Sequence, residues 1–252
     1  MQLVIITALG IGGATIAGAL IGFLFKNVSQ KMSDAILGFA AGVMLAAALM
    51  GLIIPSMESA GRSGIWMTVA GIFCGALFLN AADRLTPHLH KMTGVDIEDH
   101  AHNASLNKIL LFVMAIAIHN LPEGLAAGVS FGGEDTTNAM MVAAGIALQN
   151  IPEGMIIISP MLLNGVSKGR TLFIASLTGV VEVIGTFVGY FAAGISGAIL
   201  PFALAFAGGT MLYVISDEMI PETHSNGNER IATYALLGGV VLMILMDVFI
   251  GG

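Results

Sequence analysis

Residues Ala115–Gly128 read AIAIHNLPEGLAAG and place histidine, asparagine, proline and glutamate together inside an otherwise apolar run. Nearly the same pattern returns at Ile146–Ile157, which reads IALQNIPEGMII. Ionisable residues within long apolar segments are costly and are usually functional. Because two such polar groups occur, we expect either a bound ligand or a structural network of polar residues.

The composition around these motifs is that of a membrane protein. The 252 residues are 56% hydrophobic and 10% charged, with a mean hydropathy of +0.92. Soluble domains carry about 25% charged residues. We expect the lipid bilayer to be a partner and expect no nucleic-acid partner. The single cysteine, Cys74, excludes an intrachain disulfide.

The apolar runs predict an all-α, polytopic membrane protein with eight transmembrane helices in one domain, residues 1–252. The run Thr171–Ser216 is 46 residues long, which exceeds one crossing, and Gly194–Pro201 is the expected break. The expected helices cover about residues 3–25, 35–57, 64–82, 107–131, 138–163, 171–193, 200–220 and 231–250.

The basic residues predict the orientation. If the amino terminus is outside, eight of the nine lysines and arginines lie on the cytoplasmic side, and only Arg62 lies outside. The positive-inside rule favours this arrangement, with both termini outside the cell membrane. A histidine-containing loop at about residues 84–106 is then cytoplasmic.

A second pair of similar segments suggests an inverted repeat. FAAGVML at Phe39–Leu45 resembles FAGGTML at Phe206–Leu212, and Pro55 and Pro221 follow at nearly the same offset. The two segments belong to helices that we expect to cross in opposite directions. Such repeats are common in transporters that bind their substrate near the midplane.

Helical spacing brings the polar residues of each motif together. His119, Asn120 and Glu123 fall on adjoining parts of one helix face, and Gln149, Asn150 and Glu153 repeat the arrangement. Pro122 and Pro152 lack an N–H donor and free one backbone carbonyl each. A third span contributes the carboxylate of Glu182.

Three unpaired glutamates near the midplane would cost roughly 8 to 10 kcal/mol. Every lysine and arginine lies at a span end or in a loop, so the counter-charge is a bound cation or protons. Histidine with carboxylate and amide oxygens suits first-row divalent ions, with zinc the leading case. The alternatives are a structural polar network and, for Glu182, a proton relay.

Other residues are candidates for an exit path. The segment SDEMIPETH supplies Asp217, Glu218, Glu222 and His224. The loop at 84–106 supplies four histidines, which either buffer a departing metal or are incidental: His88, His90, His100 and His102. Met44 is either a packing residue or a soft thioether ligand.

At this point the chain resembles the ZIP (Zrt, Irt-like) metal transporters, particularly the GufA-like bacterial branch. The resemblance is carried by HNLPEG, the second N-x-P-E-G, GVVEVIG at Gly179–Gly185 and SDEMIPETH. It implies eight helices in a 3+2+3 arrangement, uptake of Zn²⁺ and a site with room for two metals. The implied ligands are Met44, His119, Asn120, Glu123, Gln149, Asn150, Glu153 and Glu182.

One departure from the family pattern matters. Many relatives have histidine or an acidic residue where this chain has Gln149 and Asn150, so the second motif contributes a single carboxylate. We therefore expect one firm metal site and one weak or transient site.

The expected function is transport of divalent metal ions into the cytoplasm by alternating access, not catalysis. Zn²⁺ is the expected substrate, with Cd²⁺, Fe²⁺, Mn²⁺ and Co²⁺ as alternatives, and a homodimer is a candidate assembly. The rival hypotheses are a metal sensor, a proton-coupled carrier of another solute and an intramembrane enzyme. For the enzyme, GVSFG at Gly128–Gly132 matches G-x-S-x-G but lies at the end of an expected membrane helix.

Overall fold

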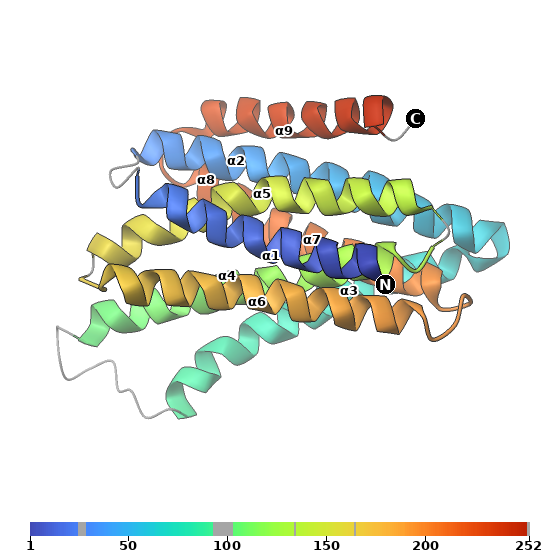
Figure 1. Ribbon diagram of the computed structural model, residues 1–252, viewed down its shortest axis with the longest axis horizontal. Helices are drawn as coiled ribbons and strands as arrows, with labels where there is room; N and C mark the ends of the chain where they lie inside the picture. Colours follow the sequence, from blue (N-terminus) through green and yellow to red (C-terminus); the bar gives the residue numbers. More distant parts are fainter. Residues whose placement is uncertain (25–28, 93–102, 134, 164, 251–252) are drawn as a thin grey trace.

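The computed structural model describes residues 1–24, 29–92, 103–133, 135–163 and 165–250, with the backbone alone at 83–92, 103–116, 160, 163 and 250. Every regular element in these ranges is a helix, and most helices run along the long axis of the molecule (Figure 1). The elements are α1 (Gln2–Gly22), α2 (Gln30–Ala46), η1 (Ala47–Ile53), α3 (Ile54–Met92), α4 (Asn103–Ser130), α5 (Thr136–Leu163), α6 (Lys168–Ala193), α7 (Leu200–Val214), η2 (Ile215–Met219), α8 (Ile220–His224) and α9 (Glu229–Ile250).

Six helical runs in the described ranges are long and apolar enough to cross a membrane, so the chain is an all-helical polytopic membrane protein. One of these runs, Gln30–Ala82, has 53 residues. A straight helix of that length would extend about 80 Å, against about 30 Å of hydrocarbon. The backbone breaks at Gly61, where φ is 61° and ψ is −175°, and the chain turns back at this point.

Two helix ends differ most from the expected ones. Helix α2 starts at Gln30 instead of residue 35, because the Ser29 side chain accepts a hydrogen bond from the Met32 N–H and caps it. Helix α3 continues to Met92, ten residues beyond the expected end at 82. Hydropathy marks where the apolar segment ends, whereas capping and helix propensity decide where the helix ends.

Two short π-helices occupy related positions. η1 ends two residues before Pro55, and η2 ends two residues before Pro221. Proline cannot donate the usual backbone hydrogen bond, which favours a local change of helical register. Each π-helix follows one of the two similar segments, and α2 and α7 run in opposite directions (Figure 1).

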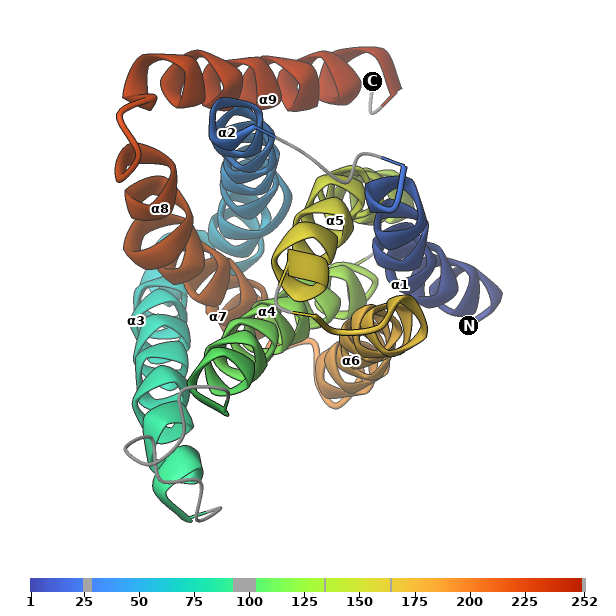
Figure 2. The same cartoon turned by 90° about the vertical axis from the view of Figure 1, so that its left-hand side faces the viewer.

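The helices form two groups. α1, α4, α5 and α6 pack mainly against one another, and the second group contains α2, α3, α7 and α9. Figure 2 shows the first group gathered on one side of the molecule, viewed along its length. The strongest contacts between the groups join α5 to α2 and α4 to α7.

Glycines set the close packing inside each group. A Cβ placed on Gly154 of α5 would lie 2.1 Å from the carbonyl oxygen of Thr15, and one on Gly42 of α2 would lie 1.9 Å from that of Leu236. Between the groups, a Cβ on Gly51 would instead meet the side chain of Val142. Helices within a group are therefore in backbone contact, whereas side chains fill the boundary between the two groups.

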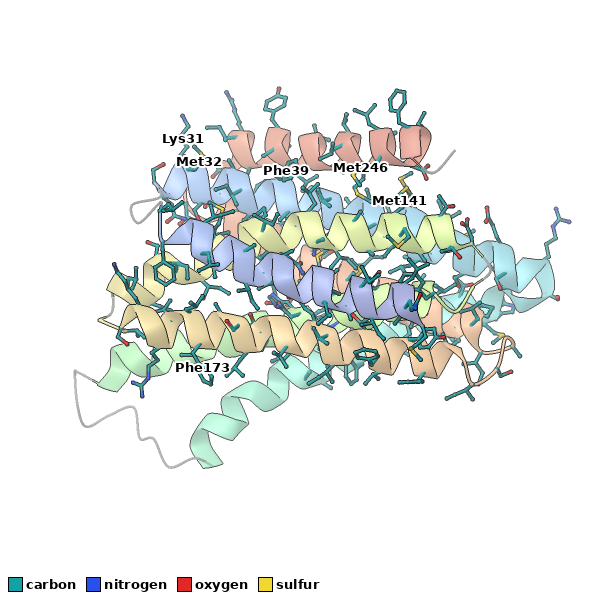
Figure 3. The ribbon with its side chains drawn as sticks, viewed as in Figure 1. Lys31, Met32, Phe39, Met141, Phe173 and Met246 are labelled. Carbon is teal, nitrogen blue, oxygen red and sulfur yellow. The ribbon has the colours of Figure 1, made fainter. Side chains whose placement is uncertain are left out.

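The outer faces carry apolar side chains, as a lipid environment requires. Figure 3 shows side chains projecting outward along the outer helices, including Phe173 of α6, which is 63% exposed. Polar groups of the two motifs lie on the inner faces instead, where the helices of the first group meet.

Candidate metal site

The polar residues of the two motifs converge in the interior. Asn120 and Glu123 of α4, Gln149 and Asn150 of α5 and Glu182 of α6 each have at most 1% of their surface exposed. Glu123 lies within electrostatic range of Glu153 and Glu182. The expected meeting of three carboxylates from three helices is therefore present in the structure.

Glu182 is surrounded by hydrogen-bond donors. Its Oε1 accepts from Thr15 Oγ1 at 2.6 Å and also from Asn120 Nδ2, and its Oε2 accepts from Asn150 Nδ2 at 2.6 Å. The donors belong to α1, α4 and α5. Hydrogen bonds to a carboxylate offset part of its desolvation cost, so Glu182 is compensated without a cation.

Glu123 has a different environment. Its Oε1 accepts one hydrogen bond, from Gln149 Nε2 at 2.7 Å, and its Oε2 is buried with no protein partner. A carboxylate oxygen can only accept hydrogen bonds or bind a cation. Glu123 therefore presents an open ligand position inside the cluster.

Four further buried oxygens lack partners. They are Asn120 Oδ1, Gln149 Oε1, Asn150 Oδ1 and Glu218 Oε1. All five unpartnered atoms are acceptors, and an unmatched buried acceptor costs about 1 to 3 kcal/mol. The five lysine and arginine side chains that the structure describes are all exposed. Such oxygens can bind a cation or accept hydrogen bonds from water.

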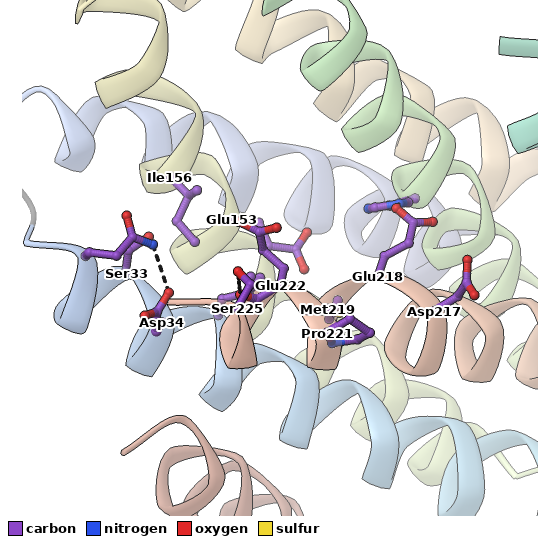
Figure 4. Close-up of a pocket in the computed structure, with 13 residues that line it drawn as sticks. Ser33, Asp34, Glu153, Ile156, Asp217, Glu218, Met219, Pro221, Glu222 and Ser225 are labelled. Atoms are coloured by element: carbon purple, nitrogen blue, oxygen red, sulfur yellow. Dashed lines mark hydrogen bonds and ion pairs between the residues drawn. The ribbon is translucent and has the colours of Figure 1, made fainter. Parts of the chain in front are cut away.

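His119 and Glu153 connect the cluster to a cavity. His119 Nε2 pairs with Glu218 Oε2 of η2, and Glu153 is half-buried. Both line a cavity of about 580 Å³ that is bounded by the start of α2, by α5 and by the η2–α8 segment (Figure 4). Exposed residues at its rim, including Gln30 and Ser225, place its mouth at the end of the molecule where α2 begins.

The lining of this cavity is acidic. Among the described residues it has five carboxylates and no lysine or arginine: Asp34, Glu153, Asp217, Glu218 and Glu222. Like charges in a low-dielectric cleft raise the local concentration of cations. The cavity can therefore attract a cation and gives it a polar route between the cluster and solvent.

Within the described ranges, no three His, Cys, Asp or Glu side chains form a group that could hold a metal ion by themselves. A metal in this cluster would thus use amide oxygens as well as Glu123 and Glu153. Mixed sets of nitrogen, carboxylate and carbonyl ligands are chemically suitable for divalent ions.

Comparison with known proteins identifies the family. Residues 96–247 match the family described as the ZIP zinc transporter, which is more than half of the chain. The chain is 41% identical to zinc transporter GufA of Myxococcus xanthus, with 98% of both chains covered. It is 36% identical to zinc transporter ZIPB of Bordetella bronchiseptica, covering 94% of this chain and 78% of that protein.

The chain belongs to the ZIP family. The resemblance to the GufA-like branch is therefore confirmed. Zinc transporter ZupT of Chlorobaculum parvum is a further relative, 34% identical over 92% of this chain and 91% of that one. Proteins of this family are transporters and not enzymes.

The serine motif of this ZIP protein has an ordinary structural setting. Ser130 is the last residue of α4, and its Oγ donates to the carbonyl of Ala127 at 2.8 Å. A G-x-S-x-G nucleophile needs a strand-to-helix turn, and this one is at the end of a helix. This position agrees with the expectation that Ser130 is not the nucleophile of a hydrolase.

The predicted exit-path residues divide into three sets. Asp217, Glu218 and Glu222 line the cavity. His224 does not, because its Nδ1 lies 2.9 Å from the Ile220 carbonyl and its Nε2 lies 3.3 Å from Thr233 Oγ1. The four remaining histidines give no test of the prediction: His88 and His90 lie on α3 where only the backbone is described, and His100 and His102 lie outside the described residues.

Met44, the expected thioether ligand, is completely buried. It belongs to the apolar cluster against which Ile118 and Leu148 pack, the neighbours in sequence of His119 and Gln149. Met44 thus shares an apolar cluster with residues of both motif helices, and no hydrogen bond joins it to the described motif residues. Its ligand role stays a prediction.

Sequence reasoning missed two polar residues of this region. Thr15 of α1 donates a hydrogen bond to Glu182. Helix α1 contains no charged residue, so nothing in its sequence marks it as part of a polar site. Asp34 is 2% exposed and accepts from Asn226 at 3.1 Å and from Asn228 at 2.8 Å, which fastens α2 to the segment before α9. Asp34 lies beside an expected span boundary, where a carboxylate carries no special signal.

Proposed function

We propose that this ZIP protein carries zinc ions across the membrane through the buried cluster. The supporting observation is the set of five buried oxygens without partners, next to an acidic cavity. A cation satisfies such a set of acceptors, and the acidic lining of the adjacent cavity favours a cation over a neutral donor. The names of the relatives support zinc as that cation. Cd²⁺, Fe²⁺, Mn²⁺ and Co²⁺ are proposed as weaker substrates because the same ligands suit them.

The proposed binding site is centred on Glu123 and Glu153. Their two negative charges match one divalent ion, and the amide oxygens of Asn120, Gln149 and Asn150 complete the shell. His119 is a candidate ligand at the cavity side, where it exchanges its pairing with Glu218 for the ion. A second ion would bring the local charge to +4 against these carboxylates, which makes it the weaker one.

Eight membrane crossings in the 3+2+3 arrangement are also proposed. The break at Gly61 divides Gln30–Ala82 into two crossings, and α4 supplies one more beyond the runs already described. The π-helices before Pro55 and Pro221 support the inverted repeat of α2 and α7. α1 starts and α9 ends at the same end of the molecule (Figure 1), as an even number of crossings requires.

The proposed orientation has both termini outside and the cavity facing the cytoplasm. Lys31, Lys168, Arg170 and Arg230 lie at the cavity end, and Arg62 lies at the other. The positive-inside rule then places the cavity end in the cytoplasm. In this conformation the cluster is open inward. We propose homodimers in the cell membrane, which crosslinking of the purified protein tests.

Alternating access requires one part of the protein to move against another. We infer that α1, α4, α5 and α6 move together, since glycines fix these helices backbone to backbone. In the other group, glycines join α2 to α9 and α3 to α7 in the same manner, and sliding at the side-chain boundary between the two groups would leave all these backbone contacts intact.

The test is zinc uptake into proteoliposomes that contain a zinc-sensitive dye. We expect the wild-type protein to accelerate uptake and Glu123→Ala to remove this acceleration. Glu229→Ala is the matched control, because Glu229 is an exposed glutamate at the start of α9. Equal uptake by Glu123→Ala and the control would refute the ligand role of Glu123. No uptake by the wild type would refute the transport function itself.

A further inference from the structure

Glu182 and its neighbours determine which way two amide groups point. A carboxylate only accepts hydrogen bonds, so an amide that faces it must present its NH₂ group. Asn120 and Asn150 both do so, through their Nδ2 atoms. Each amide then turns its oxygen the other way, and both Oδ1 atoms are buried without a partner.

Helix α1 takes part in this arrangement. Thr15, which is 1% exposed, donates to Glu182 Oε1 at 2.6 Å. The Ile11 carbonyl, one turn earlier on α1, accepts from Asn150 Nδ2 at 3.2 Å. The close packing of Gly154 on the Thr15 backbone fixes the distance between α1 and α5. Thr15 therefore has a defined position from which to hold Glu182.

The hydrogen bonds favour an indirect role for Glu182. Three donors satisfy its two oxygens, whereas Glu123 keeps a free Oε2. If Glu182 were also a ligand, a single lone-pair site on its Oε2 would be left for the ion, whereas Glu123 keeps three such sites. Glu123 and Glu153 are therefore the two carboxylates left to face a divalent ion.

We propose that Thr15 and Glu182 are a positioning pair: they orient the amides of Asn120 and Asn150 so that both amide oxygens face the transported cation, and Glu182 does not touch the ion. This inference depends on the proposed zinc site. It adds α1 to the binding apparatus and assigns the third carboxylate a task other than coordination.

The first test removes the Thr15 hydroxyl at constant shape. We expect Thr15→Val to raise the KM for zinc about three- to tenfold, with the maximal rate within about twofold of wild type, because loosened amides weaken ground-state binding. Thr15→Ser keeps a hydroxyl and is expected to restore the wild-type KM.

Thr178→Val is the matched control. Thr178 is equally buried, lies one turn from Glu182 on α6 and donates only to the Ala175 carbonyl in its own helix. We expect this variant to have the wild-type KM. A KM for Thr15→Val that equals the Thr178→Val value would overturn the proposal. If Thr15→Val does not purify as a folded protein, Thr15→Ala takes its place under the same criteria.

The second test is a double-mutant cycle with Glu182→Gln. A glutamine has one acceptor oxygen and one NH₂ group, so at least one asparagine amide must flip. The flipped amide then presents its NH₂ group to the ion instead of its oxygen. If Thr15 acts through Glu182, the double variant binds zinc no more weakly than Glu182→Gln alone. Additive losses would show that Thr15 acts independently and would contradict the pairing.

Metal content separates this proposal from the proposed function. Glu182→Gln is expected to retain zinc at saturating concentration, whereas Glu123→Ala is expected to lose it. If Glu182→Gln holds no zinc at any concentration, Glu182 is a ligand and the positioning role fails while zinc transport stands. If the wild type neither binds nor transports zinc, the proposed function fails first.

Discussion

Glu123 and Glu182 are both buried carboxylates in the same cluster, and their surroundings differ. Glu182 accepts hydrogen bonds from three helices and uses both oxygens. Glu123 accepts one and keeps a bare oxygen beside Glu153. Burial alone therefore does not make a carboxylate a metal ligand. The supply of nearby donors decides whether it is still available.

The two sides also differ in access. The Glu153 side opens into the acidic cavity through His119 and Glu218, whereas the Glu182 side is closed by α1. An ion in the cavity can therefore contact Glu153 without disturbing the hydrogen bonds of Glu182. We call these the open side and the closed side of the cluster.

The largest expected effect comes from neutralising the open side. Glu123→Gln combined with Glu153→Gln should weaken zinc binding by more than about a hundredfold, because the ion loses both opposing charges. Glu182→Gln should weaken it by less than about tenfold. Equilibrium dialysis of the detergent-solubilised protein measures both, with Glu229→Gln as control. An equal loss of zinc affinity in both variants would contradict the difference between the open side and the closed side.

Adding a charge to the closed side should create a second metal site. In Asn150→Asp, a carboxylate replaces the amide that now donates to Glu182, and two facing carboxylates repel unless a cation lies between them. We expect bound zinc to rise from about one to about two ions per chain. Asn138→Asp, a similar change at a residue that contacts the Gly51 carbonyl, is the control. An unchanged stoichiometry would mean that the closed side cannot bind metal at all.

A substitution of Met44 tests whether the open side of the cluster extends to α2. If its thioether reaches the ion, Met44→Leu should raise the KM for Cd²⁺ on the order of threefold more than the KM for Zn²⁺, since the softer ion gains more from sulfur. Met211→Leu is the control, because Met211 is equally buried and holds the matching place in the other similar segment. Identical selectivity in both variants would assign Met44 to packing.

The smallest expected effect is at the mouth of the cavity. Glu222→Gln should lower the uptake rate about twofold at low ionic strength and have little effect near 1 M salt, because exposed charges act through a screened field. Glu229→Gln, at an exposed position at the same end, should not change the rate. A loss that persists at high salt would indicate that Glu222 binds the ion directly.

Much of this could be predicted from the sequence because membranes impose simple rules. The apolar runs marked the helices, and the spacing of His119, Asn120 and Glu123 placed them on one face. The placement of every lysine and arginine at a span end or in a loop pointed to a bound cation or protons. The family resemblance came from the same motifs and is confirmed.

Other features could not be predicted, since they depend on contacts between distant segments. Thr15 and Glu182 are 167 positions apart, and His119 and Glu218 are 99 apart. No local pattern relates the members of these pairs. The continuation of α3 to Met92 was missed for another reason: a helix does not have to end where it leaves the apolar layer.

Apolar length and the positions of charges can be read along the chain, so the sequence alone was enough to place three carboxylates inside the spans of a helical membrane protein, away from every lysine and arginine. Only the tertiary structure decided which carboxylate is already satisfied. That depends on which helix packs behind it, and α1 happens to bring a hydroxyl to Glu182 and none to Glu123.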